Sequence, residues 1–167
     1  MTPITFCQWF ALGFLACVGA MAFALYLEHF QGLEPCPMCV FQRVAMVAAG
    51  LVFLAGAIHG PRKAGRWAYA VLAAAMAGAG VFVAARHVWL QGLPPDQVPA
   101  CGPTLDYLMD VLPLTEVIRT IISGDGNCAK IDAAFLGISL PGWTLVTFVG
   151  LALLALAAPI LARKDPA

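Results

Sequence analysis

Charged residues are scarce in this 167-residue chain. Asp, Glu, Lys and Arg make up 11% of it, and nine acidic residues balance nine basic ones to a net charge of zero. A sparse and balanced charge offers no basic surface, so the composition gives no indication of nucleic-acid binding. Hydrophobic residues make up 62% of the chain, which is more than a soluble domain of this length needs. The composition therefore predicts an integral membrane protein.

Four apolar segments are long enough, or nearly so, to cross a bilayer. A spanning helix takes about 20 mostly apolar residues, and in lipid its backbone groups must be paired within the helix. The sequence predicts spans at residues 9–27, 40–58, 67–85 and 143–162. Tryptophans lie near the segment ends, where interfacial anchors are expected: Trp9, Trp67, Trp89 and Trp143. We predict an all-α membrane protein in which residues 1–167 form one four-transmembrane-helix bundle.

No Lys or Arg precedes the first apolar segment, which bears on whether it is a cleaved signal. Residues 22–24 read Ala-Phe-Ala and resemble a cleavage site. A secretory signal, however, starts with a basic region and has a shorter apolar core than this segment. We therefore interpret the first segment as a retained helix.

Basic residues predict the orientation, because short cytoplasmic loops carry the excess of Lys and Arg. One side of the membrane holds a short basic loop and the basic C-terminal tail, with Arg62, Lys63, Arg66, Arg163 and Lys164. The other side holds three basic residues spread over a much longer loop, namely Arg86, Arg119 and Lys130. The sequence thus predicts that both termini are cytoplasmic and that segments 28–39 and 86–142 face outward.

Four of the six cysteines fall in the outward segments: Cys36, Cys39, Cys101 and Cys128. Disulfides form and persist in such exocytoplasmic compartments. Two cysteine pairs on one face of a membrane protein indicate that electrons pass from one pair to the other. Cys7 and Cys17 lie about 15 Å apart along one helix at 1.5 Å per residue, too far to pair with each other. We assign these two no role.

The first pair has the spacing C-x-x-C at the start of the second span. Pro37 suits the first helical position and keeps Cys36 out of the helix. Cys39 then lies in the first turn, where the helix dipole and unpaired N–H groups favour an anion. Arg43 follows one turn later on the same face. It is either an interfacial anchor or a fixed cation beside a thiolate, and the neighbouring C-x-x-C favours the second interpretation.

The second outward segment is long, as functional loops often are. Prolines around Cys101 predict an extended, exposed stretch that a partner's groove can bind. Apolar residues recur with helical spacing over residues 114–122. They predict a short helix on the membrane surface, with packing on a soluble partner as the alternative. Residues 123–128 read as a flexible turn.

Alternatives to redox chemistry exist for the cysteines. A C-x-x-C also occurs in zinc sites, and four cysteines can bind one zinc ion. The wide spacing of Cys101 and Cys128 and the oxidising compartment favour redox chemistry. Two static disulfides are less favoured, because a C-x-x-C disulfide at a helix start tends to be exchangeable. His87, at the depth of Arg43, is either an interfacial polar residue or a hydrogen-bond donor in the same pocket.

Together these motifs resemble the DsbB family, the bacterial inner-membrane quinone reductases that reoxidise the periplasmic thiol oxidase DsbA. The resemblance rests on Cys-Pro-Met-Cys at 36–39 followed by Val-Phe-Gln-Arg at 40–43, on the later cysteine pair, and on Phe-Leu-Gly at 135–137 ahead of Pro-Gly-Trp at 141–143. It covers nearly the whole chain. It implies that residues 86–142 form the second periplasmic loop, with the short interfacial helix inside it.

The resemblance also implies a role for each site residue. Cys101 and Cys128 would form the disulfide that a reduced DsbA-like partner attacks, with Cys101 taking the mixed disulfide. Cys36 and Cys39 would form the second pair, with Cys39 facing the quinone. The quinone, ubiquinone or menaquinone, would be contacted by Arg43 and His87. The chain would then be a thiol:quinone oxidoreductase with no metal.

Two other functions compete with this one. Vitamin K epoxide reductase-like proteins also combine a four-helix bundle with a C-x-x-C and a loop pair, but there the loop pair precedes the C-x-x-C. A non-catalytic membrane protein that binds zinc through the four cysteines is the other alternative.

Overall fold

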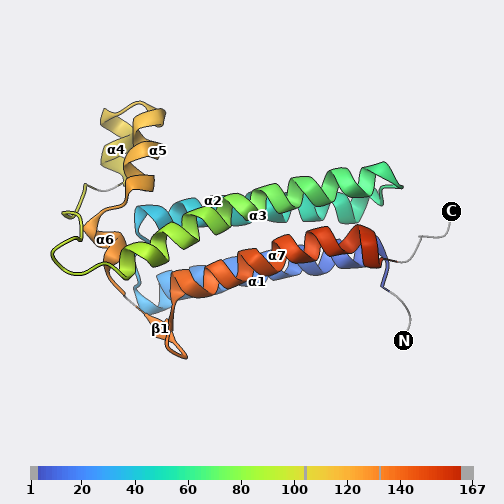
Figure 1. The fold of residues 1–167 in the computed structure, drawn as a ribbon, viewed down its shortest axis with the longest axis horizontal. Coiled ribbons are helices and arrows are strands. Elements are labelled where there is room, and N and C mark those ends of the chain that lie inside the picture. The colour runs from blue at the N-terminus through green and yellow to red at the C-terminus, as the bar shows by residue number, and fades with distance from the viewer. Residues whose placement is uncertain (1–3, 104, 132, 163–167) are drawn as a thin grey trace.

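In a computed structural model, which describes residues 4–103, 105–131 and 133–162, four long helices form an elongated bundle (Figure 1). They are α1 (Phe6–Gln31), α2 (Pro37–His59), α3 (Ala64–Gln91) and α7 (Leu140–Leu161). Each is long and apolar enough to cross a membrane. The prediction of an all-α protein with four spans is confirmed, and the first three helices extend past the expected segments at both ends.

The two ends of the bundle differ (Figure 1). The start of α1 and the end of α7 lie at one end, which we call the terminal end. At the other end α1 stops, α2 begins, α3 stops and α7 begins. All the shorter elements gather there, together with the four cysteines of the two predicted pairs. We call this the cysteine end.

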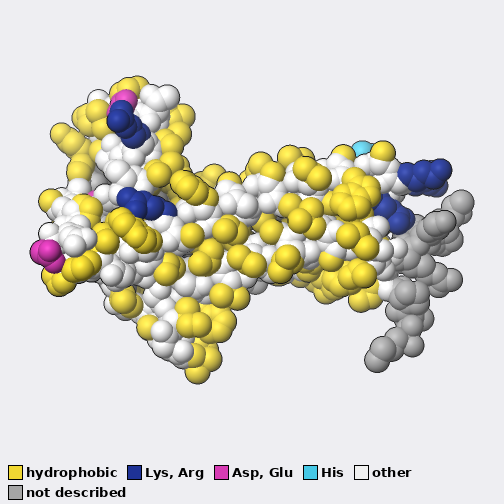
Figure 2. Space-filling view, viewed as in Figure 1, with side chains coloured by type: hydrophobic (Ala, Val, Ile, Leu, Met, Phe, Trp, Pro, Cys, Tyr) yellow, Lys and Arg dark blue, Asp and Glu magenta, His cyan; other side chains and the backbone are white. Residues whose placement is uncertain are grey.

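Aromatic rings packed against glycines bring the long helices close together. A Cβ atom on Gly80 of α3 would lie 2.3 Å from the ring of Phe148 on α7, and one on Gly13 of α1 would lie 2.5 Å from the ring of Phe53 on α2. Both rings are fully buried. Small residues allow close helix approach in membranes, where the packing of side chains drives association. The outer surface between the two ends is mainly apolar, as lipid contact requires (Figure 2).

In the described part of the long connection between α3 and α7 there are five short elements. They are α4 (Leu105–Val111), α5 (Leu114–Ser123), α6 (Gly126–Ala129) and the antiparallel strands β1 (Ala134–Phe135) and β2 (Ile138–Ser139). The predicted short helix is confirmed as α5, which runs across the bundle axis (Figure 1). Its buried residues Val117 and Ile121 pack in a cluster with Leu90, Met38 and Cys128. Part of its apolar face thus contacts the cysteine end itself.

The flexible turn predicted at residues 123–128 is wrong. Asp125 begins α6 as its N-cap, and its carboxylate accepts a hydrogen bond from the Cys128 N–H at 3.1 Å. The Gly126 N–H donates to the Ala100 carbonyl at 3.1 Å. These bonds fix a helical turn and hold it beside the Cys101 segment. Cys128 is consequently buried, with 1% of its surface exposed.

Candidate redox site

The C-x-x-C lies at the start of α2, as predicted. Pro37 occupies the first turn and Cys36 is the N-cap with extended backbone. The Cys36 sulfur accepts the Cys39 N–H at 3.3 Å, so this thiol caps the helix. The Cys36 thiol also lies 2.9 Å from the Cys39 sulfur in a hydrogen bond. Cys39 therefore sits at the positive end of a helix dipole, where a thiolate is stabilised.

Cys128 meets the C-x-x-C at Cys36. The Cys36 Sγ, a ring nitrogen of His87 and the Cys128 Sγ all lie within 4.8 Å of one another. Since Cys36 also contacts Cys39, it is within reach of both other sulfurs. The structure thus joins one member of each predicted cysteine pair at a single point, which the sequence did not specify.

The Cys128 thiol is held in its protonated form. Its hydrogen bond with Cys36, followed by its burial, raises the pKa of Cys128 well above the ordinary range for a thiol. The thiolate is the reactive species in disulfide exchange. Cys128 must therefore lose this proton before it can act as a nucleophile.

Cys101 differs from Cys128 in being exposed. Its segment has no regular secondary structure, and the exposure that the surrounding prolines predicted is present. The Asn127 side chain donates to the Gly102 carbonyl at 3.5 Å, and a Cβ atom on Gly126 would lie 3.1 Å from the Cys101 sulfur. The Cys101 segment is thus tied to the helical turn that carries Cys128, with one sulfur outside and the other inside.

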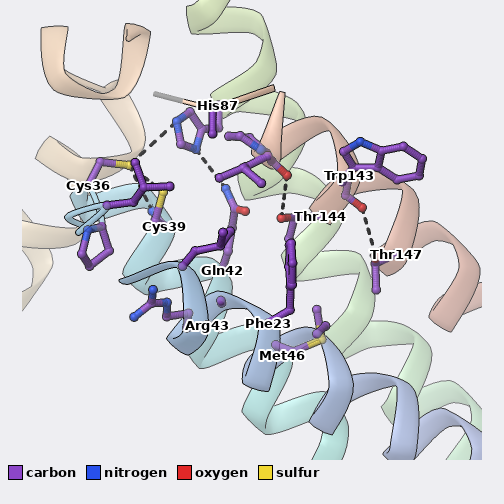
Figure 3. Close-up of a pocket in the computed structure, with 18 of the residues that line it drawn as sticks. Phe23, Cys36, Cys39, Gln42, Arg43, Met46, His87, Trp143, Thr144 and Thr147 are labelled. Carbon is purple, nitrogen blue, oxygen red and sulfur yellow. Dashed lines mark hydrogen bonds between the residues drawn. The ribbon is translucent and has the colours of Figure 1, made fainter. Parts of the chain in front are cut away.

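Gln42 is a site residue that the sequence analysis missed. It is buried in α2, with 5% of its surface exposed. Its amide nitrogen lies 3.0 Å from His87 Nδ1, and the other ring nitrogen of His87 lies 3.8 Å from Cys36 Sγ (Figure 3). The histidine is therefore oriented between an amide and a thiol. A polar residue one turn inside an apolar span, three positions after Cys39, was the available signal.

We expect Gln42→Leu to lower the free energy of unfolding by about 1–3 kcal/mol, because His87 Nδ1 loses its partner inside the protein. Equilibrium unfolding of the purified protein in detergent measures this change. Val44→Ala on the exposed side of the same helix is the matched control and should have a much smaller effect. Equal losses in the two variants would show that the Gln42–His87 contact contributes nothing specific.

Arg43 has a partner on the first helix. Its guanidinium forms an ion pair with the carboxylate of Glu28, in the last turns of α1. Both side chains are partly exposed. The pair fixes the arginine at the cysteine end and spans from α2 to α1. The sequence placed Arg43 on the face of Cys39 but gave no indication of Glu28, because that contact depends on how the helices pack.

A cavity of about 250 Å³ lies beside these groups, between α1, α2, α3 and α7. Cys36, Cys39, Arg43 and His87 all line it. The remaining wall is mainly apolar, with Phe23, Met46 and Trp143 among its residues (Figure 3). Phe23 is also exposed on the outer surface of α1, so the cavity reaches the apolar flank of the bundle. An apolar wall with a cation, an imidazole and a thiol fits the head group of a quinone.

Comparison with known proteins agrees with this geometry. The family model described as "Disulfide bond formation protein DsbB" matches residues 7–158. The chain belongs to the DsbB family. Disulfide bond formation protein B of Xanthomonas euvesicatoria pv. vesicatoria (strain 85-10) is 52% identical over 157 residues, 93% of this chain and 91% of the relative. That of Marinobacter nauticus (strain ATCC 700491 / DSM 11845 / VT8) is 52% identical over 147 residues, 88% of each chain.

The family resemblance drawn from the motifs is therefore confirmed. As a DsbB, the chain is a disulfide-forming membrane oxidoreductase, of the kind that oxidises DsbA and passes the electrons to quinone. A vitamin K epoxide reductase-like activity, the nearest enzymatic alternative, is set aside by the same match.

The alternative that the four cysteines bind one zinc ion can be compared with the geometry of this DsbB. Cys36, His87 and Cys128 each present one ligand atom within a space that a metal ion can occupy. Within the described residues, that ligand cluster does not include Cys101, which is exposed. The site that joins all four cysteines around one ion is thus not assembled. The two sulfurs that do come together, those of Cys36 and Cys128, belong to different predicted pairs.

Proposed function

We propose that this DsbB moves two electrons from a DsbA-like thiol oxidase, through Cys101–Cys128 and then Cys36–Cys39, to ubiquinone or menaquinone. The single observation that carries the proposal is the approach of Cys128 to Cys36 beside a cavity that Cys39 and Arg43 line. It supplies a continuous path from an exposed sulfur to a pocket at the flank of the bundle.

The first step takes place at Cys101. A thiolate of the reduced partner attacks the exposed Cys101 sulfur of the Cys101–Cys128 disulfide, and Cys128 leaves. The second thiol of the partner then attacks the mixed disulfide and releases Cys101. The partner gains a disulfide, and the two electrons and two protons that it loses are now carried by the thiols of Cys101 and Cys128.

The second step takes place inside the cysteine end. Cys128, once deprotonated, attacks Cys36 of the Cys36–Cys39 disulfide, and Cys39 leaves as the thiolate at the helix start. The protons that Cys128 and then Cys101 release end on the leaving sulfurs of Cys39 and Cys36. Because the Gln42 amide nitrogen donates to His87 Nδ1, His87 Nε2 carries a hydrogen and presents it toward Cys36. Cys101 then attacks Cys128 in the Cys36–Cys128 disulfide. The loop pair is oxidised again, and Cys36 and Cys39 are reduced.

The last step takes place at the cavity. A bound quinone supplies a two-electron acceptor, which is needed because DsbA is already a strong oxidant at about −120 mV. Cys39 faces the cavity and is stabilised as a thiolate by the start of α2. Arg43, held by Glu28, places a fixed positive charge where negative charge develops. Cys36 and Cys39 lose two electrons and two protons and return to a disulfide.

We also propose the orientation. Residues 1–167 form one membrane domain in the bacterial inner membrane, with the termini cytoplasmic and the cysteine end periplasmic. Arg62, Lys63 and Arg66 support this, since all three lie in or beside the α2–α3 loop at the terminal end. Arg163 and Lys164, which entered the sequence prediction, lie outside the described residues.

One experiment tests the function as a whole. Purified protein, a reduced DsbA-like partner and ubiquinone or menaquinone are mixed, and quinone reduction is followed while the thiols are alkylated and assigned by mass spectrometry. We expect quinone reduction that depends on the partner, with thiols appearing at all four cysteines. Absence of quinone reduction, or a stoichiometric zinc content in the same preparation, contradicts the proposal.

The orientation has its own test. In intact cells with a permeable outer membrane, a thiol reagent that cannot cross the inner membrane should label Cys101 in the reduced protein. Labelling of Cys101 only after the inner membrane is opened would reverse the orientation and remove the periplasmic partner.

A further inference from the structure

Two side chains of α3 hold the segment that carries Cys128, one on each side of it. Before Cys128, the Arg86 Nε donates to the Ile122 carbonyl at 3.2 Å and its Nη2 donates to the Ser123 carbonyl at 3.0 Å. After Cys128, the Gln91 Nε2 donates to the Lys130 carbonyl at 3.2 Å. The segment from 122 to 130 is thus attached at both ends to the last turns of one transmembrane helix.

Between these attachments the segment packs directly on α3. Gly124 has a positive φ of 82°, and a Cβ atom there would lie 2.3 Å from a methyl group of Leu90. Leu90 is buried and belongs to the same apolar cluster as Cys128 and Met38. Only glycine allows both the backbone conformation and the close approach. The contact removes most of the freedom that the segment would have between its two attachments.

The arginine itself is well oriented. Its guanidinium lies 4.1 Å from the ring centre of Trp89, in a cation–π contact. Its acceptors are the carbonyls at the C-terminal end of α5, which lack partners within that helix and favour a cation. Arg86 therefore joins the end of α5 to the outer end of α3 through charge-assisted bonds, which are stronger than bonds between neutral groups.

His87 follows Arg86 directly on α3, and Gln91 lies one turn further along. The helix that presents His87 to Cys36 therefore also fixes the segment that presents Cys128 to His87. We infer that Arg86 and Gln91 are positioning residues for the exchange between the two cysteine pairs, because they hold the Cys128 sulfur against Cys36. This inference rests on the proposed function and assigns these residues to its second step.

The attachments made by Arg86 and Gln91 should matter little for the first step, the attack of the partner on Cys101. Cys101 is exposed, and its segment is tied to α6 by separate bonds from Gly126 and Asn127. Neither Arg86 nor Gln91 is a partner in those bonds. Attack on Cys101 by the partner is therefore expected to proceed when Arg86 is replaced. The transfer from Cys128 to Cys36 depends on a geometry that Arg86 maintains, and misplaced reacting groups slow a reaction strongly.

The test separates the two steps. Quinone-free protein with both pairs oxidised is mixed rapidly with the reduced DsbA-like partner, quenched in acid, alkylated and analysed cysteine by cysteine. For Arg86→Gln we expect thiols at Cys101 and Cys128 to appear at the wild-type rate. Thiols at Cys36 and Cys39 should appear about tenfold more slowly than in the wild-type protein, because the Cys128 sulfur is no longer held against Cys36. Arg86→Lys, which keeps the charge and one donor group, should recover part of that rate.

Controls decide between a positioning role and a merely structural one. Arg119→Gln changes an exposed arginine of α5 and should leave both steps unchanged. If Arg86→Gln does not fold, Gln91→Met removes the other attachment at similar side-chain volume, and the same delay in the second step is expected. Equal slowing of both steps, or no delay in the second, overturns the inference. If the wild-type protein itself fails to pass electrons to Cys36 and Cys39, the proposed function fails instead.

Discussion

Replacing Cys39 by serine will trap the protein with a disulfide between Cys36 and Cys128. Without Cys39, the sulfur of Cys36 has no partner in its own pair, and the Cys128 sulfur lies within 4.8 Å of it. The Cys36 thiolate attacks Cys128 of the Cys101–Cys128 disulfide, Cys101 leaves as a thiol, and the chain stops at the Cys36–Cys128 disulfide, so quinone reduction falls to background. Non-reducing peptide mapping by mass spectrometry should find the 36–128 crosslink as the main product, with Cys101 left as a free thiol.

Cys36→Ser is the matched variant for this experiment. Cys39 remains in it, yet the close approach of Cys128 is to Cys36, so a 39–128 crosslink should be rare. Both variants lose quinone reduction, and only the Cys39 variant should form the crosslink efficiently. Equal yields of the two crosslinks would mean that Cys128 reaches either sulfur, and the order of steps proposed for the relay would be wrong.

Replacing Arg43 by glutamine will reduce kcat/KM for quinone by about a hundredfold, the loss typical of removing one preorganised group that stabilises developing charge. Arg43 lines the cavity with Cys39, and its guanidinium is held in place by Glu28. The rate at which the reduced partner reacts with Cys101 should stay unchanged, because Cys101 is exposed and does not line this cavity. Steady-state kinetics with varied quinone and fixed partner measure the first quantity, and quenched mixing measures the second.

Two further variants sharpen this result. Glu28→Gln keeps Arg43 but removes the ion pair that orients it, so we expect a smaller loss in the same parameter. Arg119→Gln changes an exposed arginine of α5 that does not line the cavity, and it should leave quinone kinetics unchanged. An unaltered quinone dependence in Arg43→Gln would remove this residue from the mechanism.

Features that depend on neighbouring residues in the sequence were predicted well. Hydropathy is a local property, and all four spans are present. The helix start at Pro37, with Cys36 as the cap and Cys39 in the first turn, follows from the chemistry of four consecutive residues. Local sequence patterns could not predict the partners of Arg43 and His87. Arg43 contacts Glu28, and His87 contacts Gln42, only because different helices pack together.

The connection between α3 and α7 shows the same limit. Helix α6 exists because Asp125 caps it and the Ala100 carbonyl accepts a bond from its first residue. The sequence pattern of residues 123–128 predicted only a flexible turn. The hairpin between β1 and β2 turns at Leu136 and Gly137, both with positive φ. Asparagine or aspartate before glycine is the usual signal for such a turn, and leucine in that place conceals it.

The contrast between an exposed Cys101 and a buried Cys128 bears on leakage to small-molecule reductants. Glutathione and similar metabolites need direct access to a sulfur atom before they can donate to it. Of the two sulfurs in the Cys101–Cys128 pair, only that of Cys101 is exposed to the surroundings. A small thiol can therefore reach this pair directly only at Cys101, while burial shields Cys128 from wasteful reduction.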